Sequence, residues 1–456
     1  MAKLKSINPA NGEVNGEVKI SISTEITSKV AAARKAYATW REVGLKDRLK
    51  FIKSIRNEVA KNKSEIAKLT TMEMGKPVSE ARPSVESNLR AIDWLLDNSE
   101  RILKPETTIS SPSEIHQIFY EPLGVVAAIA PWNFPSGNMF IPVLTNLIVG
   151  NTVVFKHSEL CPLTGEYLAK IFTKILPKGV FNLVNGDGKV GEELANQDVD
   201  LIYFTGSQPV GHKLYETAAK KFIRAFLELG GSAPGVVFAD ADLGQLTKSI
   251  FDQRFHNNGQ VCTSLKRLIV EKSIADDLID RLSKMLSAKK IGDPLKKETD
   301  FGPLASEKQV GRAKVQLEDA LSKGAKIVAK LELPENLKGA FFAPVILKNI
   351  RKNMKVWTEE VFAPILPMVT FNSEKEALEL ANETPFGLGG YVYSSDKKKA
   401  ERVARQIVTG NVSINGPEYY RHQNPFGGAK ISGIGRQNGS LGLHNLCNIK
   451  VIAHKR

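Results

Sequence analysis

Hydrophobic and polar residues along the chain follow two periods, which together predict an α/β protein. Apolar residues recur at helical spacing over residues 26–40 and 49–59. From residue 152, short apolar runs alternate with helical patterns. The runs read as strands are TVVFK (152–156), VFNLVN (180–185), LIYFTG (201–206) and IRAFLELGG (223–231). This β-α repetition predicts a parallel sheet covered by helices on both faces.

A second α/β pattern with different spacing begins near residue 229 and predicts a second unit. Its strands include GVVF, RLIVEK, PMVTF, GGYVYS and GNVSIN, and its helices span 241–256, 273–288, 306–322, 373–382 and 397–407. Two further segments, 110–120 and the ending LCNIKVIAHKR, alternate like edge strands. We expect them to form a small β arm that pairs with another subunit.

Length and composition fit this picture of several units. The chain has 456 residues, 42% of them hydrophobic and 25% charged, which is typical of a globular protein too long for one core. The start, MAKLKSINPANGEV, has no apolar region of a secretory signal. The most apolar runs are far shorter than the roughly 20 residues of a membrane span. We therefore expect no membrane association.

The charged, cysteine and histidine residues exclude several function classes. The net charge is +14, but the lysines are scattered and form no basic tail, so we expect no nucleic-acid partner. The three cysteines are far apart, which argues against disulfides and favours a reducing, cytoplasmic location. No histidine spacing predicts a metal site.

Two glycine-containing turns compete as a phosphate-binding site. Gly186, Gly188 and Gly191 satisfy GxGxxG between a predicted strand and helix. One unit later, Gly206 and Ser207 end a strand and would also offer N–H groups and a hydroxyl to phosphate. The residues alone do not rank these turns, and either one also fits a turn without a ligand.

A lysine and a glutamate at the end of the strand 152–156 suggest recognition of a ribose. Lys156 and Glu159 would hydrogen-bond the sugar hydroxyls, and the carboxylate would repel a 2′-phosphate, which favours NAD over NADP. The alternative is a pair of solvated charges at a strand end.

Several short motifs occur together along the chain. They are INPANGE, MGKP, PWNFP (131–135), VVFKHSE, FTGSQPVG, LELGG, NNGQVCTS (257–264), EEVFAP and PFGGAKISGIGR. Their order and spacing resemble those of the aldehyde dehydrogenase superfamily over essentially the whole chain. The resemblance implies a Rossmann-like parallel-sheet cofactor domain over 1–105 and 123–228 and a second α/β catalytic domain over 229–418. It also implies a small β oligomerisation arm over 106–122 and 437–456.

The resemblance also implies a set of cofactor-binding residues. In this family the cofactor phosphates lie near the FTGS turn, so Ser207 takes precedence over the GxGxxG glycines. Glu360 and Phe362 match the residues that hold the nicotinamide ribose and ring. His157 and Gln208 depart from the usual family residues and leave NADP open beside NAD. The full implied set is Trp132, Lys156, Glu159, Gly206, Ser207, Leu229, Glu360 and Phe362.

Cys262, in NNGQVCTS, would be read as a buried filler if it stood alone. The family spacing to Glu228 and Asn133 instead implies a nucleophile that forms a thiohemiacetal and then a thioester with an aldehyde. The Asn133 amide and the Cys262 N–H would stabilise the adduct oxygen. Glu228 would activate water to release a free acid, because coenzyme A-dependent members typically lack that glutamate.

The substrate is predicted less directly. The motifs LELGGSAP, NNGQVC and LKR resemble the succinate-semialdehyde dehydrogenase-type branch, which implies a small acidic aldehyde such as succinate semialdehyde. Arg254 or Arg421 would then clamp the carboxylate, or His256 would line the pocket. Lactaldehyde or another short aldehyde is the alternative substrate. A Cys262–His256 hydrolase and a catalytically silent member are alternatives from other classes. A homodimer or homotetramer is expected.

Overall fold

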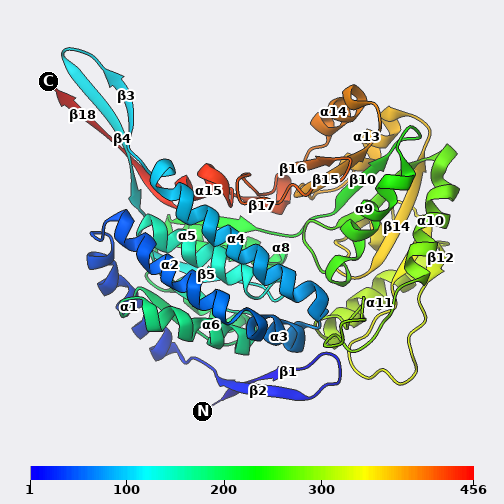
Figure 1. Cartoon of the computed structure of the whole chain (residues 1–456), viewed down its shortest axis with the longest axis horizontal. Coiled ribbons are helices and arrows are strands. Elements are labelled where there is room, and N and C mark those ends of the chain that lie inside the picture. The colour runs from blue at the N-terminus through cyan, green and yellow to red at the C-terminus, as the bar shows by residue number, and fades with distance from the viewer. Residues whose placement is uncertain (1) are drawn as a thin grey trace.

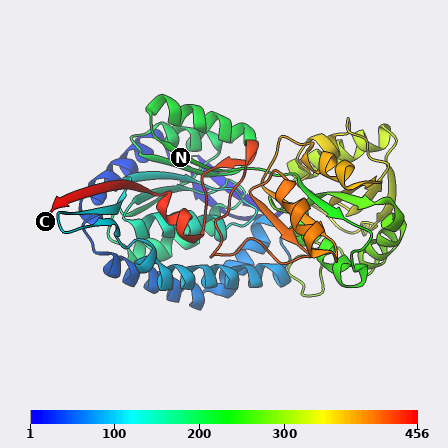
Figure 2. The ribbon, with the colours of Figure 1, turned by 90° about the horizontal axis from the view of Figure 1, so that it is seen from above.

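The computed structural model describes residues 2–456, so only residue 1 of the predicted domains lies outside it. The chain forms two α/β lobes and a projecting β arm (Figures 1 and 2), each lobe built on its own sheet. This confirms the α/β class and the two parallel-rich sheets expected from the alternating pattern. Within the described residues, no helix combines the length and apolar character needed to cross a membrane.

The first lobe contains a six-stranded sheet in the order β17-β9-β8-β5-β6-β7. Five strands are parallel, and the short β17 pairs antiparallel with β9. Of these strands β5 comes first in the sequence. Strands β6 and β7 follow on one side of it, and β8 and β9 then follow on the other side. The strands are β5 (Val125–Ile129), β6 (Thr152–Lys156), β7 (Phe181–Val184), β8 (Leu201–Thr205), β9 (Arg224–Glu228) and β17 (Gly433–Ile434).

Helices cover both faces of this sheet, as alternating side chains in its strands require. Val126 and Phe155 pack with α2, α4, α5 and α6, whereas Val125 and Val154 pack on the opposite face with α1, α7 and α8. A hairpin, β1 (Lys3–Ile7) and β2 (Val14–Lys19), lies at the N-terminal end. The helices are α1 (Ser23–Trp40), α2 (Leu45–Lys61), α3 (Lys63–Met74), α4 (Val78–Ile102), α5 (Gly137–Val149), α6 (Pro162–Ile175), α7 (Gly188–Asn196) and α8 (Gln208–Lys221).

The second lobe contains a seven-stranded sheet in the order β12-β13-β14-β11-β10-β15-β16, parallel except at β12. Its strands are β10 (Ala233–Val237), β11 (Leu265–Glu271), β12 (Lys326–Lys330), β13 (Val345–Lys348), β14 (Ile365–Phe371), β15 (Gly389–Tyr393) and β16 (Asn411–Ile414). Its helices are α9 (Leu243–Phe255), α10 (Ala275–Ser287), α11 (Glu307–Ser322), α12 (Lys355–Thr358), α13 (Glu374–Asn382) and α14 (Lys397–Gln406).

A three-stranded antiparallel arm projects from the first lobe (Figure 1). It consists of β3 (Glu106–Ser110), β4 (Glu114–Pro122) and β18 (Cys447–Lys455), in the order β18-β4-β3. On β18 the side chains of Ile449 and Val451 are 63% and 61% exposed. Helix α15 (Gly439–His444) precedes β18. The exact domain boundaries and the role of this arm in assembly stay predictions.

Candidate active site

The carboxyl ends of four parallel strands converge at one edge of the first sheet. Asn133 follows β5, Lys156 ends β6, Ser207 follows β8 and Glu228 ends β9. Ligands of open α/β sheets bind at this edge, at the point where the strand order reverses, and here that point lies beside β5. Cys262 reaches the same region from the second lobe, in the segment before β11. The site therefore lies between the lobes.

A left-handed turn presents Cys262. Asn257, Asn258 and Gly259 adopt φ angles of 52°, 54° and 70° in succession, a conformation that costs free energy for residues other than glycine. The turn is fixed from outside, because Asn257 Nδ2 donates a hydrogen bond of 3.0 Å to the main-chain oxygen of Asn133. This hydrogen bond joins the segment that contains Cys262, in the second lobe, to the segment that contains Asn133, in the first lobe.

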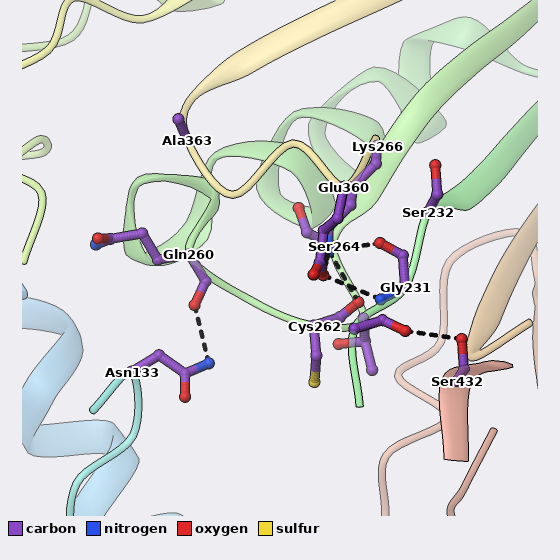
Figure 3. Close-up of polar contacts among 12 residues, drawn as sticks. Asn133, Gly231, Ser232, Gln260, Cys262, Ser264, Lys266, Glu360, Ala363 and Ser432 are labelled. Carbon is purple, nitrogen blue, oxygen red and sulfur yellow. Dashed lines mark hydrogen bonds and ion pairs between the residues drawn. The ribbon is translucent and has the colours of Figure 1, made fainter. Parts of the chain in front are cut away.

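The Cys262 side chain is half-buried and faces the side on which the Asn133 carboxamide lies (Figure 3). Burial raises the pKa of its thiol to about 12; Lys266 acts in the opposite direction, while Glu228 and Glu360 raise it further. The sulfur is therefore a thiol at neutral pH. Attack on a carbonyl requires that this proton leave when the substrate binds.

Glu228 is the most unusual carboxyl group of the site. It is 4% exposed, and within residues 2–456 neither of its oxygens has a hydrogen-bond partner. Burial raises its pKa well above the usual range, and only the positive charge of Arg436 opposes this. A buried carboxyl group without partners destabilises the fold, so a functional reason for it is expected. Its charge influences Cys262, so the two groups lie near one another.

Asn133 is held by hydrogen bonds on both ends of its carboxamide. Its Nδ2 donates a hydrogen bond of 3.1 Å to the main-chain oxygen of Gln260 (Figure 3). Its Oδ1 accepts a hydrogen bond of 3.1 Å from Asn138 Nδ2. The side chain is 6% exposed. Since an amide nitrogen carries two hydrogens, one N–H remains for an oxygen bound beside Cys262.

Lys266 is a site residue that the sequence reasoning missed. Its fully buried ammonium donates hydrogen bonds of 2.8 Å to the main-chain oxygen of Gly231 and of 3.3 Å to that of Cys262. It also forms an ion pair with the Glu360 carboxylate. Glu360 Oε1 also accepts 3.0 Å from the Gly231 N–H (Figure 3). The available signal was the pair of basic residues Lys266 and Arg267 within the strand LKRLIVE, because buried charges need a specific partner.

The remaining cofactor candidates from the sequence form two groups. Phe362 lies edge-on to Trp132 at 5.6 Å between ring centroids, and the Lys266 ammonium is 5.1 Å from the Phe362 ring. At the end of β6, the buried Lys156 ammonium is 3.3 Å from Glu159, whose side chain is 45% exposed. Glu159 is thus held in place while its carboxylate stays available to a ligand.

The two helices that follow the glycine turns differ in what occupies their N-termini. At α7, the Asp187 carboxylate accepts 2.9 Å from Lys189 N and places a negative charge where a phosphate would bind. At α8, Ser207 is exposed and makes no capping bond with its side chain. Below this second turn Leu229 packs against Gly211, where a Cβ would lie 2.6 Å from it. The turn at Gly206 and Ser207 fits a dinucleotide phosphate better.

Arg254, one of the two arginines expected to clamp the substrate, has another role. It is fully buried. Its guanidinium donates hydrogen bonds of 3.2 Å to the Leu265 main-chain oxygen and of 3.3 Å to Ser264 Oγ, and it also donates to the Ala363 main-chain oxygen. These bonds join α9, β11 and the 359–364 segment. The structure therefore does not favour a clamp at Arg254.

Arg421 and His256 remain accessible. Arg421 is exposed, and within residues 2–456 its side chain makes no hydrogen bond or ion pair. The loop before it approaches the cysteine, since Tyr419 donates 3.3 Å to the Thr263 oxygen. His256 is 46% exposed at its side chain, and its Nδ1 is 3.3 Å from Glu80. It does not contact Cys262 as the base of a cysteine hydrolase would.

A cavity of about 370 Å³ lies beside the cysteine, where Val261 and Thr263 line it. Its ionisable lining is mostly acidic. The carboxylates are those of Glu80, Asp252, Asp300 and Glu418, and the basic groups are Lys289 and His256.

Comparison with known proteins identifies the family of this chain. The model of the aldehyde dehydrogenase family matches residues 2–452. The NADP-dependent succinate-semialdehyde dehydrogenase of Escherichia coli is 35% identical, over 97% of this chain and 92% of its own. Peroxisomal aminoaldehyde dehydrogenase 1 of Pisum sativum is 35% identical, over 99% and 92%.

A solved structure agrees equally well. Betaine aldehyde dehydrogenase from Staphylococcus aureus, in complex with NAD⁺, superposes with a TM-score of 0.95 at 31% identity, covering 99% of this chain and 91% of that one. Family match, identity and fold thus agree over nearly the full length. The chain belongs to the aldehyde dehydrogenase family and is an NAD(P)-dependent aldehyde dehydrogenase.

Proposed function

We propose that this enzyme oxidises a short aldehyde, best represented by succinate semialdehyde, to the free carboxylic acid through a thioester on Cys262. The observation that carries this proposal is the Glu228 carboxyl group, which is buried without a partner beside Cys262. Such a group is suited to accept a proton from water at a thioester. Transfer to a thiol such as coenzyme A would not need it.

The first step forms the bond between the Cys262 sulfur and the carbonyl carbon, and the thiol proton leaves to water. The carbonyl oxygen becomes an alkoxide. The free N–H of Asn133 and the main-chain N–H of Cys262 would donate to it, and each such donor contributes about 3 kcal/mol in acyl-transfer sites.

The bound nicotinamide cofactor supplies the hydride acceptor that converts the adduct into a thioester. We propose that Ser207 and Gly206 hold its phosphates, Lys156 and Glu159 its adenosine ribose, and Glu360 its nicotinamide ribose. Phe362 and Trp132 would contact the ring, while Leu229 supports the α8 turn from below. Lys266 holds Glu360 and the Cys262 carbonyl in place.

In the last step Glu228 takes a proton from water, and the resulting hydroxide attacks the thioester carbon. The C–S bond breaks and the sulfur leaves as a thiolate, which regains a proton. One aldehyde, one water and one oxidised cofactor thus give one acid, one reduced cofactor and one proton.

For the substrate, Arg421 supports a carboxylate-bearing aldehyde. Its guanidinium is unpaired, and it follows two tyrosines at the site, Tyr419 and Tyr420. A second candidate, an ω-aminoaldehyde, is supported by the acidic lining of the 370 Å³ cavity, where Glu418 makes no ion pair within residues 2–456. The positive charge of Arg421 predicts a preference for an acidic aldehyde, whereas the acidic lining of the cavity predicts a preference for a basic one.

A panel of three aldehydes of equal length separates these candidates. We would measure kcat/KM for succinate semialdehyde, butanal and 4-aminobutanal, with both NAD and NADP. The variants are Arg421→Ala and Glu418→Gln, with Arg405→Ala on α14 as the matched exposed control. We expect succinate semialdehyde to lead and Arg421→Ala to reduce its advantage over butanal by about tenfold. An unchanged advantage would remove the clamp, and a preference for 4-aminobutanal that Glu418→Gln abolishes would establish the second candidate.

A further inference from the structure

Lys76, in the segment between α3 and α4, is a buried ammonium that the reaction as described does not use. It is 1% exposed, and no acceptor within residues 2–456 hydrogen-bonds its Nζ. The ammonium lies over the ring of Phe134, with the ring centroid 4.0 Å from Nζ. A buried charge without an acceptor is costly, so a benefit elsewhere is expected.

The charged groups around Lys76 come from two other elements. Glu80, on α4, is the acid whose charge acts on Lys76. Its Oε2 accepts a hydrogen bond of 2.8 Å from Asn257 N and lies 3.3 Å from His256 Nδ1. Although burial acts to raise it, the pKa of Glu80 is lowered, by His256 first and also by Lys76. The Glu80 carboxylate thus serves two other donors, and the Phe134 ring is left as the direct contact of the ammonium.

Contact with a ring face depends on the charge of Lys76. Burial lowers the pKa of its ammonium to about 8, and Glu80 opposes this shift. A desolvated cation–π contact favours the charged ammonium, and the neutral amine does not make it. The contact is therefore present below pH 8 and is lost as the pH rises above that value.

Phe134 is adjacent to Asn133 in the segment 131–135, which has no regular secondary structure. Such a segment is fixed by its side-chain contacts. Asn257 holds it from one side, by the 3.0 Å bond to the Asn133 oxygen, and Lys76 holds it through the Phe134 ring. A displacement of the ring would move the Asn133 amide relative to Cys262.

We propose that Lys76 is a positioning residue for Asn133, acting through the face of Phe134, and that its charged form maintains the productive position. This rests on the proposed function, since it assumes that Asn133 acts on the adduct oxygen. Its consequence is a decrease of kcat/KM on the alkaline side, near pH 8, that arises neither from the thiol nor from Glu228. Both of those groups gain reactivity as they lose protons.

The test uses Lys76→Met, which keeps the length and removes the charge, and Lys76→Arg, which keeps it. Lys68→Met, an exposed lysine on α3, is the matched control. We expect Lys76→Met to lower kcat/KM about tenfold at pH 7 (~1.4 kcal/mol) and to flatten the alkaline decrease. Lys76→Arg should retain activity and move the decrease to higher pH, and the control should match the wild type.

A double-mutant cycle with Asn133→Ala separates positioning from a general structural effect. Lys76→Met should reduce kcat/KM by less than about twofold in the Asn133→Ala background. An equal tenfold loss in both backgrounds, or an unchanged pH profile in Lys76→Met, overturns the proposal. Should Lys76→Met not fold, Phe134→Leu removes the same contact and must reproduce the flattened profile.

The outcomes also separate this inference from the proposed function. An Asn133→Ala variant with normal kcat would refute the role of Asn133, and the Lys76 proposal with it. An impaired Asn133→Ala beside a normal Lys76→Met would refute only the Lys76 proposal.

Discussion

Replacing Glu228 by glutamine tests the hydrolytic half of the reaction. The substitution keeps the shape of the side chain and removes its ability to accept a proton. Because neither carboxyl oxygen has a hydrogen-bond partner within residues 2–456, no ion pair is broken by the change. We therefore expect the variant to fold and to bind cofactor, and to stop after the thioester has formed.

The expected magnitude follows from the role of a general base. Such groups contribute about 10²- to 10⁴-fold, or ~3–5 kcal/mol of barrier. Steady-state turnover of Glu228→Gln should fall by this factor, while the first turnover still releases about one reduced cofactor per active site. Stopped-flow absorbance at 340 nm measures both. Glu192→Gln, an exposed carboxylate on α7, is the matched control and should behave as the wild type.

The raised pKa of Glu228 adds a stability signature. Its folded-state pKa lies above the unfolded value, so its contribution to stability is fully present below about pH 4.3 and is lost as pH rises through the folded pKa. The Tm of the wild type should therefore decline toward alkaline pH more than that of Glu228→Gln. Turnover of Glu228→Gln within tenfold of the wild type, or loss of the burst together with turnover, would refute the assignment.

Three further substitutions test the rest of the site. Asn133→Ala should slow the burst about 10²- to 10³-fold with cofactor affinity, measured by fluorescence titration, unchanged; a normal burst rate would exclude the amide as a donor. Glu159→Gln should raise kcat/KM with NADP relative to NAD, since it removes a charge that repels a 2′-phosphate, and an unchanged ratio would count against ribose recognition. Lys266→Met leaves Glu360 without its buried partner, so thermal denaturation should show a loss of about 3–5 kcal/mol; a loss below 1 kcal/mol would contradict the pairing.

The strands of both sheets could largely be predicted because buried parallel strands are short continuous apolar runs. Two of the elements that were not predicted, α5 and β5, lack a clear period. Helix α5 is buried from Met139 to Val149, so it has no polar face to reveal helical spacing. The segment of β5 lies in one long run of small apolar residues, which gives no boundary.

Candidate site residues could be predicted where a sequence motif identifies them. They were harder to predict where the role of a residue depends on the contacts of its side chain. Cys262, Glu228 and Asn133 were identified together through the spacing of family motifs, and the structure places them in one region. Arg254 was suggested by its closeness to Cys262 in sequence, which says nothing about the side of α9 on which its guanidinium lies. Similarly, only the structure shows that Asp187 fills the N-terminus of α7.

The central claim is that Cys262 forms a covalent bond with the substrate carbon. Intact-protein and peptide mass spectrometry of Glu228→Gln, quenched in acid after one turnover with NAD and succinate semialdehyde, tests it most directly. The account predicts that the mass of the acyl group appears on the peptide containing Cys262 and is absent in Cys262→Ser. A burst of reduced cofactor that leaves Cys262 unmodified, or that places the acyl group on another residue, would contradict the claim.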